Sequence, residues 1–167
     1  MTGSTLPFDP IAEASRHWRE HGWDQYAGGM AAVTSVMRAQ QILNSRVDAQ
    51  LRPLGLSFAR YEVLMLLTFS RGGLLPMRVI GDRLQVHPTS VTNAVDRLEA
   101  DGLVRRQPHP QDRRAVLVDL TDEGRSLAEE ATQRLNAGVF TDLGLSARQE
   151  RTLTGVLEQL RRGAGDF

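Results

Sequence analysis

The sequence predicts a mostly helical protein that carries one small β-wing. Over most of the chain, apolar residues recur at steps of three and four, which is the period of amphipathic helices. The pattern changes to alternation only in residues 103–106 and 115–120, which predict two strands. The polar segment 107–113 between them contains prolines and is typical of a hairpin tip.

Composition favours one folded unit. A chain of 167 residues with 41% hydrophobic residues can bury one ordinary core. The absence of cysteine excludes disulfides, thiolate metal sites and cysteine-based redox sensing. A net charge of zero argues against a non-specific polycation and leaves only a local basic patch as an electrostatic route to nucleic acid.

Targeting signals are not recognisable. Residues 1–10 lack the basic start and apolar run of a signal peptide, and the apolar stretch 63–67 is too short to cross a bilayer. We therefore expect a cytoplasmic protein that does not contact membranes.

Two helices are expected at the beginning of the chain. Asp9 and Pro10 provide an N-cap and a first-turn proline for an amphipathic helix over 11–23. Glycines at 22, 28 and 29 are expected to separate it from a long helix over 30–51. Ser57 should then cap a further helix, whose apolar stripe is formed by Tyr61, Leu64, Met65 and Phe69.

Residues 76–100 have a helix-turn-helix pattern. A short helical segment ends at 85–88, and a second helix follows with Val91, Val95 and Leu98 inward. His87 occupies the N-cap position, and Pro88 the first helical position, where its missing N–H costs nothing. The opposite face carries short hydrogen-bonding side chains, among which Asn93 can pair with adenine in the major groove. The alternative is that these side chains only solvate an exposed helix end.

The hairpin that follows concentrates positive charge. Residues 103–114 contain four arginines and one acid, Asp112, and so have a net charge of +3. Arginines beside a hairpin tip can reach phosphates or enter a narrow minor groove. A helix-turn-helix followed by such a hairpin is a winged helix, which usually binds DNA. The alternative is a solvated hairpin with ordinary ion pairs.

Two helices should close the chain. Thr121 caps the first, which runs towards Phe140, and Ser146 with Gln149 forms a capping box for the second. Leu153, Val156, Leu157 and Leu160 lie on one side of the last helix, which therefore needs a partner surface.

The hairpin also carries a family resemblance. Residues 112–121 read DRRAVLVDLT, which fits the pattern D-x-R-x-x-x-V-x-L-T, and Gly124 fits its usual continuation. The preceding LEADGLVRR segment and most of 30–160 also resemble the MarR family of transcriptional regulators. The resemblance implies one MarR-like domain over 1–167, in which 9–54 and 122–162 are mainly dimerisation helices. Residues 57–121 would be the winged-helix DNA-binding lobe.

The resemblance implies a sequence-specific regulator that binds double-stranded DNA. We expect a homodimer on a palindromic operator, acting as a repressor released by a small anionic or aromatic effector. In the family pattern, Asp112 stabilises the wing by a salt bridge and Arg114 contacts the minor groove. The residues expected to contact DNA lie on the second helix and the wing: Pro88, Thr89, Ser90, Thr92, Asn93, Arg97, His109, Arg113 and Arg114.

The effector site is predicted from a branch of the family. An extra N-terminal helix with a Trp resembles the urate-responsive branch, and Trp18, Glu62 and Arg106 could fill three of its ligand positions. Ala94 stands where that branch has an arginine, so a different small carboxylate or aromatic anion is an alternative effector to urate.

The sequence also allows functional classes other than an effector-responsive regulator. His17 and His21 lie four residues apart, beside Glu20 and Asp24, a spacing that would suit a metal-responsive regulator. The alternative is that these residues form a solvated polar face of the helix. A constitutive DNA-binding module without an effector is a further alternative. No catalytic motif stands out, so we expect no enzyme activity, no cofactor and no resident metal.

Overall fold

The computed structural model describes residues 6–112 and 114–167. Contacts within the chain define two compact units, Met1–Arg46 and Val47–Phe167. The single domain expected over 1–167 remains a prediction. Within the described ranges, no helix has the length and apolarity that crossing a membrane requires.

The first unit is helical. In α1 (Pro10–Glu20), the Asp9 side chain accepts a hydrogen bond from the Ile11 amide at 2.9 Å, as an N-cap does. The next helix, α2 (Asp24–Leu51), begins six residues before the predicted start and continues into the second unit. Gly28 and Gly29 lie inside this helix, so the prediction that they interrupt the chain was wrong. The break spans residues 21–23, so α1 ends three residues before its predicted end, and Gly22 within the break has a φ of +78°.

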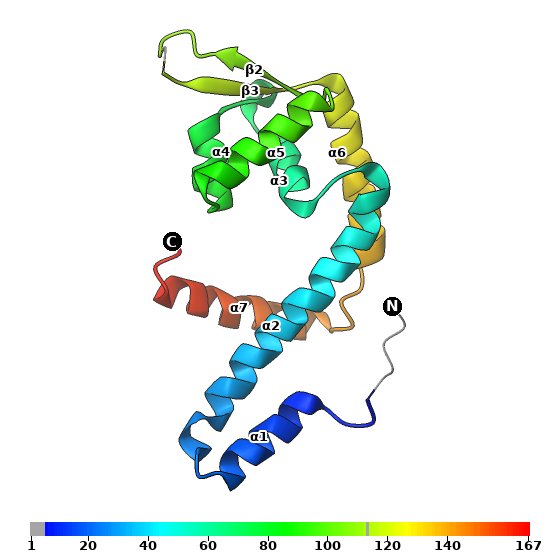
Figure 1. The fold of residues 1–167 in the computed structure, drawn as a ribbon. Coiled ribbons are helices and arrows are strands. Elements are labelled where there is room, and N and C mark those ends of the chain that lie inside the picture. Colours follow the sequence, from blue (N-terminus) through cyan, green and yellow to red (C-terminus); the bar gives the residue numbers. More distant parts are fainter. Residues whose placement is uncertain (1–5, 113) are drawn as a thin grey trace. The chain divides into compact units, whose positions relative to one another are not determined.

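The core of the second unit lies among the end of α2, which contributes Val47 and Leu51, four further helices and a small sheet (Figure 1). After the short η1 (Arg52–Leu54), these helices are α3 (Phe58–Thr68), α4 (Met77–Leu84), α5 (Pro88–Ala100) and α6 (Asp122–Leu135). Each contributes fully buried aliphatic or alanine side chains, including Leu64, Ile80, Leu98 and Leu135. The amphipathic patterns therefore identified the inward positions of these helices, with one error on the stripe predicted after Ser57. Phe69 lies just past the end of α3 and is 79% exposed, because the chain leaves the helix there.

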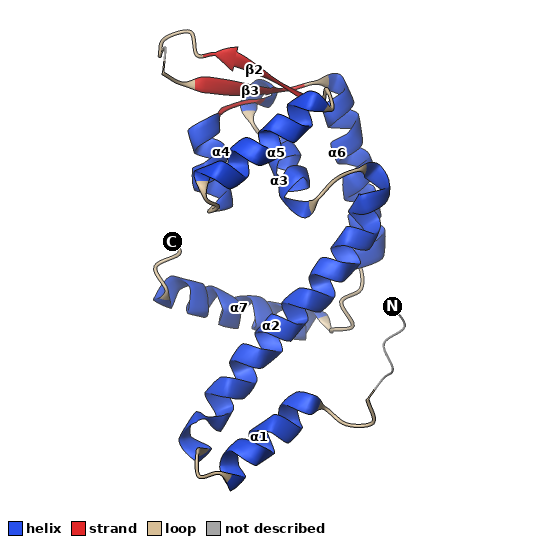
Figure 2. Ribbon diagram, in the orientation of Figure 1, coloured by secondary structure: helices blue, strands red, loops and turns tan. Residues whose placement is uncertain are grey.

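Three antiparallel strands form the sheet, coloured red in Figure 2. The predicted hairpin is β2 (Val104–Pro108) and β3 (Val116–Leu120), with Arg105 opposite Asp119. A third strand, β1 (Leu74–Pro76), follows the short η2 (Arg71–Gly73) and pairs with β3, which gives the order β1-β3-β2. This strand was not predicted, because three residues are too few to display an alternating pattern.

Close packing joins the base of the hairpin to α6. Thr121 caps α6 by accepting from the Gly124 amide at 3.0 Å, as predicted. Gly124 is buried, and a Cβ built on it would lie 2.0 Å from the carbonyl oxygen of Leu103. Only glycine fits at this contact.

The chain ends in a helix with little buried surface. A π-helical turn, η3 (Asn136–Phe140), continues α6, and Ser146 and Gln149 form the predicted capping box of α7 (Ala147–Gly163). Leu153, Val156 and Leu160 on α7 are 45%, 59% and 63% exposed. The apolar side of α7 is thus uncovered in the single chain.

Candidate nucleic-acid interface

The second helix of the helix-turn-helix begins where the sequence predicts. The Nδ1 atom of His87, the N-cap of α5, accepts from the Thr89 amide at 3.3 Å, and Pro88 occupies the first helical position. The turn before it contains Gln85 with φ of +53°, a left-handed conformation that ends α4. These local features fix the direction in which α5 leaves the turn.

Burial separates the two faces of α5. Val91, Ala94, Val95 and Leu98 are buried, and Val95 and Leu98 are fully inaccessible. The remaining positions of the first turns present hydrogen-bonding or charged side chains to solvent: Thr89, Ser90, Thr92, Asn93, Asp96 and Arg97. Short polar groups on the first turns of an exposed helix can reach base edges in a major groove.

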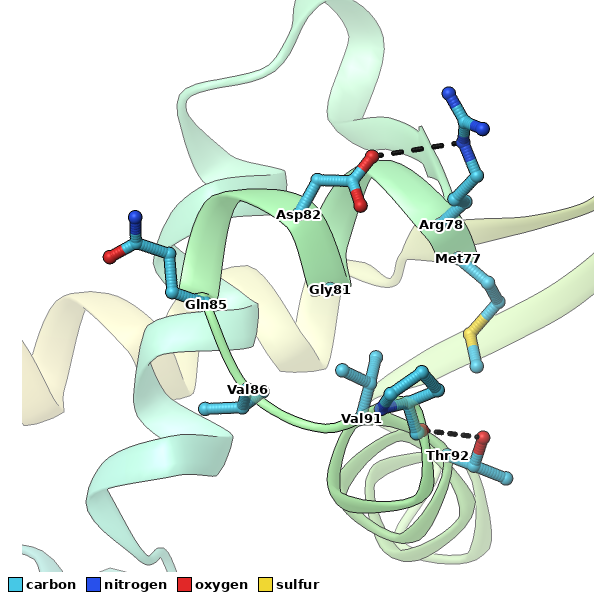
Figure 3. Close-up of a pocket in the computed structure, with 9 residues that line it drawn as sticks. Met77, Arg78, Gly81, Asp82, Gln85, Val86, Val91 and Thr92 are labelled. Atoms are coloured by element: carbon cyan, nitrogen blue, oxygen red, sulfur yellow. Dashed lines mark hydrogen bonds and ion pairs between the residues drawn. The ribbon is translucent and has the colours of Figure 1, made fainter. Parts of the chain in front are cut away.

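A shallow groove runs between α4 and the first turns of α5 (Figure 3). Its volume is about 480 Å³, and Met77, Val86 and Val91 give it an apolar floor. At its edge, the Thr92 hydroxyl donates to the Pro88 carbonyl at 3.0 Å, which fixes the rotamer of Thr92.

The wing loop is shaped by its own side chains. The Nδ1 atom of His109 accepts from the amides of Gln111 and Asp112, at 3.2 and 3.1 Å. The Asp112 carboxylate in turn accepts from the Arg114 amide at 2.9 Å. The described contact of Asp112 is therefore with the backbone of the loop, whereas the resemblance implied a salt bridge. The side chain of Arg114 is exposed, and Arg113 lies outside the described residues.

Acids outside residues 103–114 neutralise part of the positive charge of this segment. Arg105 pairs with Asp119 on the opposite strand at 3.1 Å, and Arg106 pairs with Asp96 and Glu99 on α5. Counting charge over 103–114 alone overlooked these three carboxylates. The exposed positive charge that the structure describes on the wing loop is therefore that of Arg114.

Arg106 was predicted to contact an effector, but the structure gives it other partners. Its two terminal nitrogens lie 2.5 Å from Glu99 Oε2 and 2.5 Å from Asp96 Oδ1. Hydrogen bonds from the Arg106 amide and guanidinium lower the pKa of Glu99. An anionic effector would have to compete with both carboxylates for this guanidinium. The sequence alone did not suggest the pairing, because its partners lie on different elements.

The other two predicted effector residues have separate environments. Glu62 on α3 is partly buried, and burial raises its pKa, as expected for a carboxyl group losing water. Trp18 belongs to the first unit, where it packs edge to face against Trp23 with ring centroids 5.4 Å apart. The described contacts of Arg106 do not include either residue. Their role in effector binding remains a prediction.

The two histidines of the metal alternative are engaged by the helix itself. His17 lies 3.3 Å from Glu13 and 3.1 Å from Glu20, and His21 Nδ1 lies 2.8 Å from the His17 carbonyl oxygen. Among residues 6–112 and 114–167, no group of three or more side chains has the arrangement that could hold a metal ion. The geometry gives no support to a metal-responsive regulator.

Comparisons with known proteins identify a family model and relatives that match this chain. The model of the MarR family matches residues 54–115, which span the helix-turn-helix and most of the wing. Among curated relatives, the HTH-type transcriptional regulator YhbI of Bacillus subtilis is 32% identical over 124 residues, or 72% of this chain and 79% of the relative.

Solved structures of MarR family regulators are also similar to this chain. Sco5413, a MarR family transcriptional regulator from Streptomyces coelicolor, is 52% identical with a TM-score of 0.76, over 84% of this chain and 97% of that protein. Sco3205, a MarR family regulator from the same organism solved in complex with DNA, is 28% identical with a TM-score of 0.70, over 79% and 85% of the two chains. These proteins are transcriptional regulators and not enzymes.

Proposed function

This chain belongs to the MarR family of transcriptional regulators, and we propose that it binds a palindromic operator in double-stranded DNA as a homodimer. By covering a promoter, the bound dimer would repress transcription until a small anionic or aromatic effector releases it.

The exposed polar face of α5 beside the wing loop carries the proposal. Asn93 lies on the exposed face of α5, and the Asp112 carboxylate holds the backbone next to Arg114. In our proposal, Thr89, Ser90, Thr92, Asn93 and Arg97 face the major groove. Pro88 fixes the start of the helix, and His109, Arg113 and Arg114 lie on the wing, which contacts the phosphates or the minor groove.

Uncovered apolar surface supports the homodimer. On α7, the row formed by Leu153, Val156 and Leu160 is exposed, and α2 independently exposes Val33 and Met37 at 60% and 59%. Exposed apolar rows of this kind on a regulator mark interaction surfaces. A second copy of the chain supplies a matching row, and a two-fold dimer would present two α5 helices to two half-sites.

Selection from random duplexes tests the proposed DNA recognition. We expect purified protein to enrich an inverted repeat whose half-site centres lie one helical turn apart, about 10 base pairs. Recovery of unrelated sequences, bound no better than the starting pool, would contradict sequence-specific recognition.

Release by an effector needs a separate test. We propose that Glu62 and Trp18 contribute to the effector site, with Arg106 available only to an anion that displaces its carboxylate partners. A panel of small aromatic and carboxylic acids, urate included, should contain a compound that weakens operator binding in an anisotropy assay. If no compound alters binding, the constitutive DNA-binding alternative is favoured.

A further inference from the structure

An ion cluster links β2 of the wing to α5. Besides its two 2.5 Å contacts to Asp96 and Glu99, Arg106 donates its backbone amide to Glu99 Oε1 at 2.8 Å. Glu99 therefore receives both the backbone and the side chain of one residue. Asp96 and Glu99 are three residues apart on α5 and so lie on the same face.

The position of Arg106 in the sheet makes this contact important for the wing. β2 is an edge strand, because the order is β1-β3-β2. The amide of Arg106 donates to Glu99, so this carboxylate takes the place of a neighbouring strand. In its absence, the β2·β3 ribbon would keep its own ladder but lose the bonds that orient it against α5.

The guanidinium of Arg106 is the shielded member of the cluster, whereas Asp96 is 53% exposed. The Arg106 side chain is 25% exposed, against 71% for Arg105 on the same strand. A planar guanidinium can bind two carboxylates at once in a fixed geometry, which a lysine ammonium cannot do. The three charged groups thus hold β2 at one angle to α5.

We propose that Arg106 is a positioning residue for DNA binding, which orients the wing so that Arg114 reaches the duplex while Asn93 is in the major groove. The inference rests on the proposed DNA-binding function. Arg106 itself does not touch DNA in this account, and it acts through Arg114.

A double-mutant cycle between Arg106 and Arg114 tests this dependence. Operator affinity is measured for the wild type, Arg106→Gln, Arg114→Ala and the double variant. If Arg106 acts through Arg114, the loss of operator affinity caused by Arg114→Ala should be smaller by more than about 3-fold in the Arg106→Gln background. A difference of this size exceeds the deviation from additivity that independent sites show. Equal losses in both backgrounds would overturn the proposal.

Variants on the helix side separate positioning from simple charge. The double variant Asp96→Asn/Glu99→Gln removes two negative charges near the duplex, so electrostatics alone predicts tighter binding. Positioning predicts weaker operator binding, because the wing is released. If the Asp96→Asn/Glu99→Gln variant binds the operator more tightly than the wild type, and Arg114→Ala costs it the same affinity, the proposal is overturned. This test holds even if Arg106→Gln fails to fold.

Two controls identify the source of a failure. Arg71→Gln removes an exposed arginine of η2, outside the predicted DNA contacts and the predicted dimerisation segments, and should leave operator affinity unchanged. Arg106→Lys keeps the charge but not the fork, and should resemble Arg106→Gln; full rescue by lysine would also contradict the proposal. A wild-type protein that binds no duplex would refute the proposed function itself, whereas specific binding with an additive cycle would refute only the role of Arg106.

Discussion

Asn93 is the exposed side chain of α5 best suited to read a base. Its amide can donate to and accept from one adenine, while the neighbouring Thr92 hydroxyl is held by the Pro88 carbonyl. The backbone of Arg114 is held by Asp112, and its guanidinium is exposed at the wing loop. We therefore propose that Asn93 reads a base, whereas Arg114 contacts phosphates or the minor groove.

Replacing Asn93 by alanine should weaken binding to the selected operator by about 1–3 kcal/mol, and binding to random duplex by less. Anisotropy titrations on both duplexes measure the difference. An equal loss on the two probes would make Asn93 a backbone contact.

Arg114→Ala should weaken operator binding most at low salt, because a cation that neutralises a phosphate displaces a condensed counterion. The slope of log affinity against log salt should fall in magnitude by about 1. Unchanged affinity at low salt would remove Arg114 from the interface.

Glu62 gives a prediction for stability. Its pKa is raised by burial, so the folded state holds this proton more tightly than the unfolded state. The contribution of Glu62 to stability therefore rises as pH falls towards 4.5, the ordinary carboxyl value. Glu62→Gln should therefore raise Tm at pH 7, and the gain should vanish near pH 4.5. The control Glu129→Gln, at an exposed position on α6, should change Tm little. A Glu62→Gln variant that melts below the wild type at pH 7 would contradict the burial cost.

Among the elements, the helix-turn-helix and hairpin were predictable because their signals are local. His87 and Pro88 fix the start of α5, and the change to alternate residues marks β2 and β3. The sequence did not reveal β1, nor the pairing of Arg106 with Asp96 and Glu99. Both depend on contacts between separate elements, which no local period records.

Gly124 tests the junction between the wing and α6. Gly124→Ala should destabilise the protein by about 1–3 kcal/mol or more, because its Cβ would collide with the Leu103 carbonyl, which is backbone and cannot turn aside. Chemical denaturation measures the loss. The matched control is Gly155→Ala on α7, where a Cβ meets nothing within 4 Å and should stabilise the helix by up to about 1 kcal/mol. Equal stability of the two variants would contradict the close packing.

At the scale of the whole molecule, the proposed function requires two copies of the chain. One α5 helix and one wing cover a single half-site, whereas a palindrome requires two. The exposed apolar rows on α7 and on α2 are the surfaces that a second copy would cover. The predicted dimerisation segments, 9–54 and 122–162, contain both rows.

Truncation after Ser146 removes α7 and should yield monomeric or aggregated protein in sedimentation experiments, with loss of operator binding. Truncation after Gly163 keeps the apolar row of α7 and should preserve the dimer. A chain ending at Ser146 that still sediments as a dimer would assign dimerisation to other surfaces.

Hydroxyl-radical footprinting of the wild-type protein on its selected operator tests recognition by a symmetric dimer most directly. We predict two protected segments related by two-fold symmetry, with centres about one helical turn of B-DNA apart. Protection of one half-site alone at saturation, or no protection on any duplex, would contradict it.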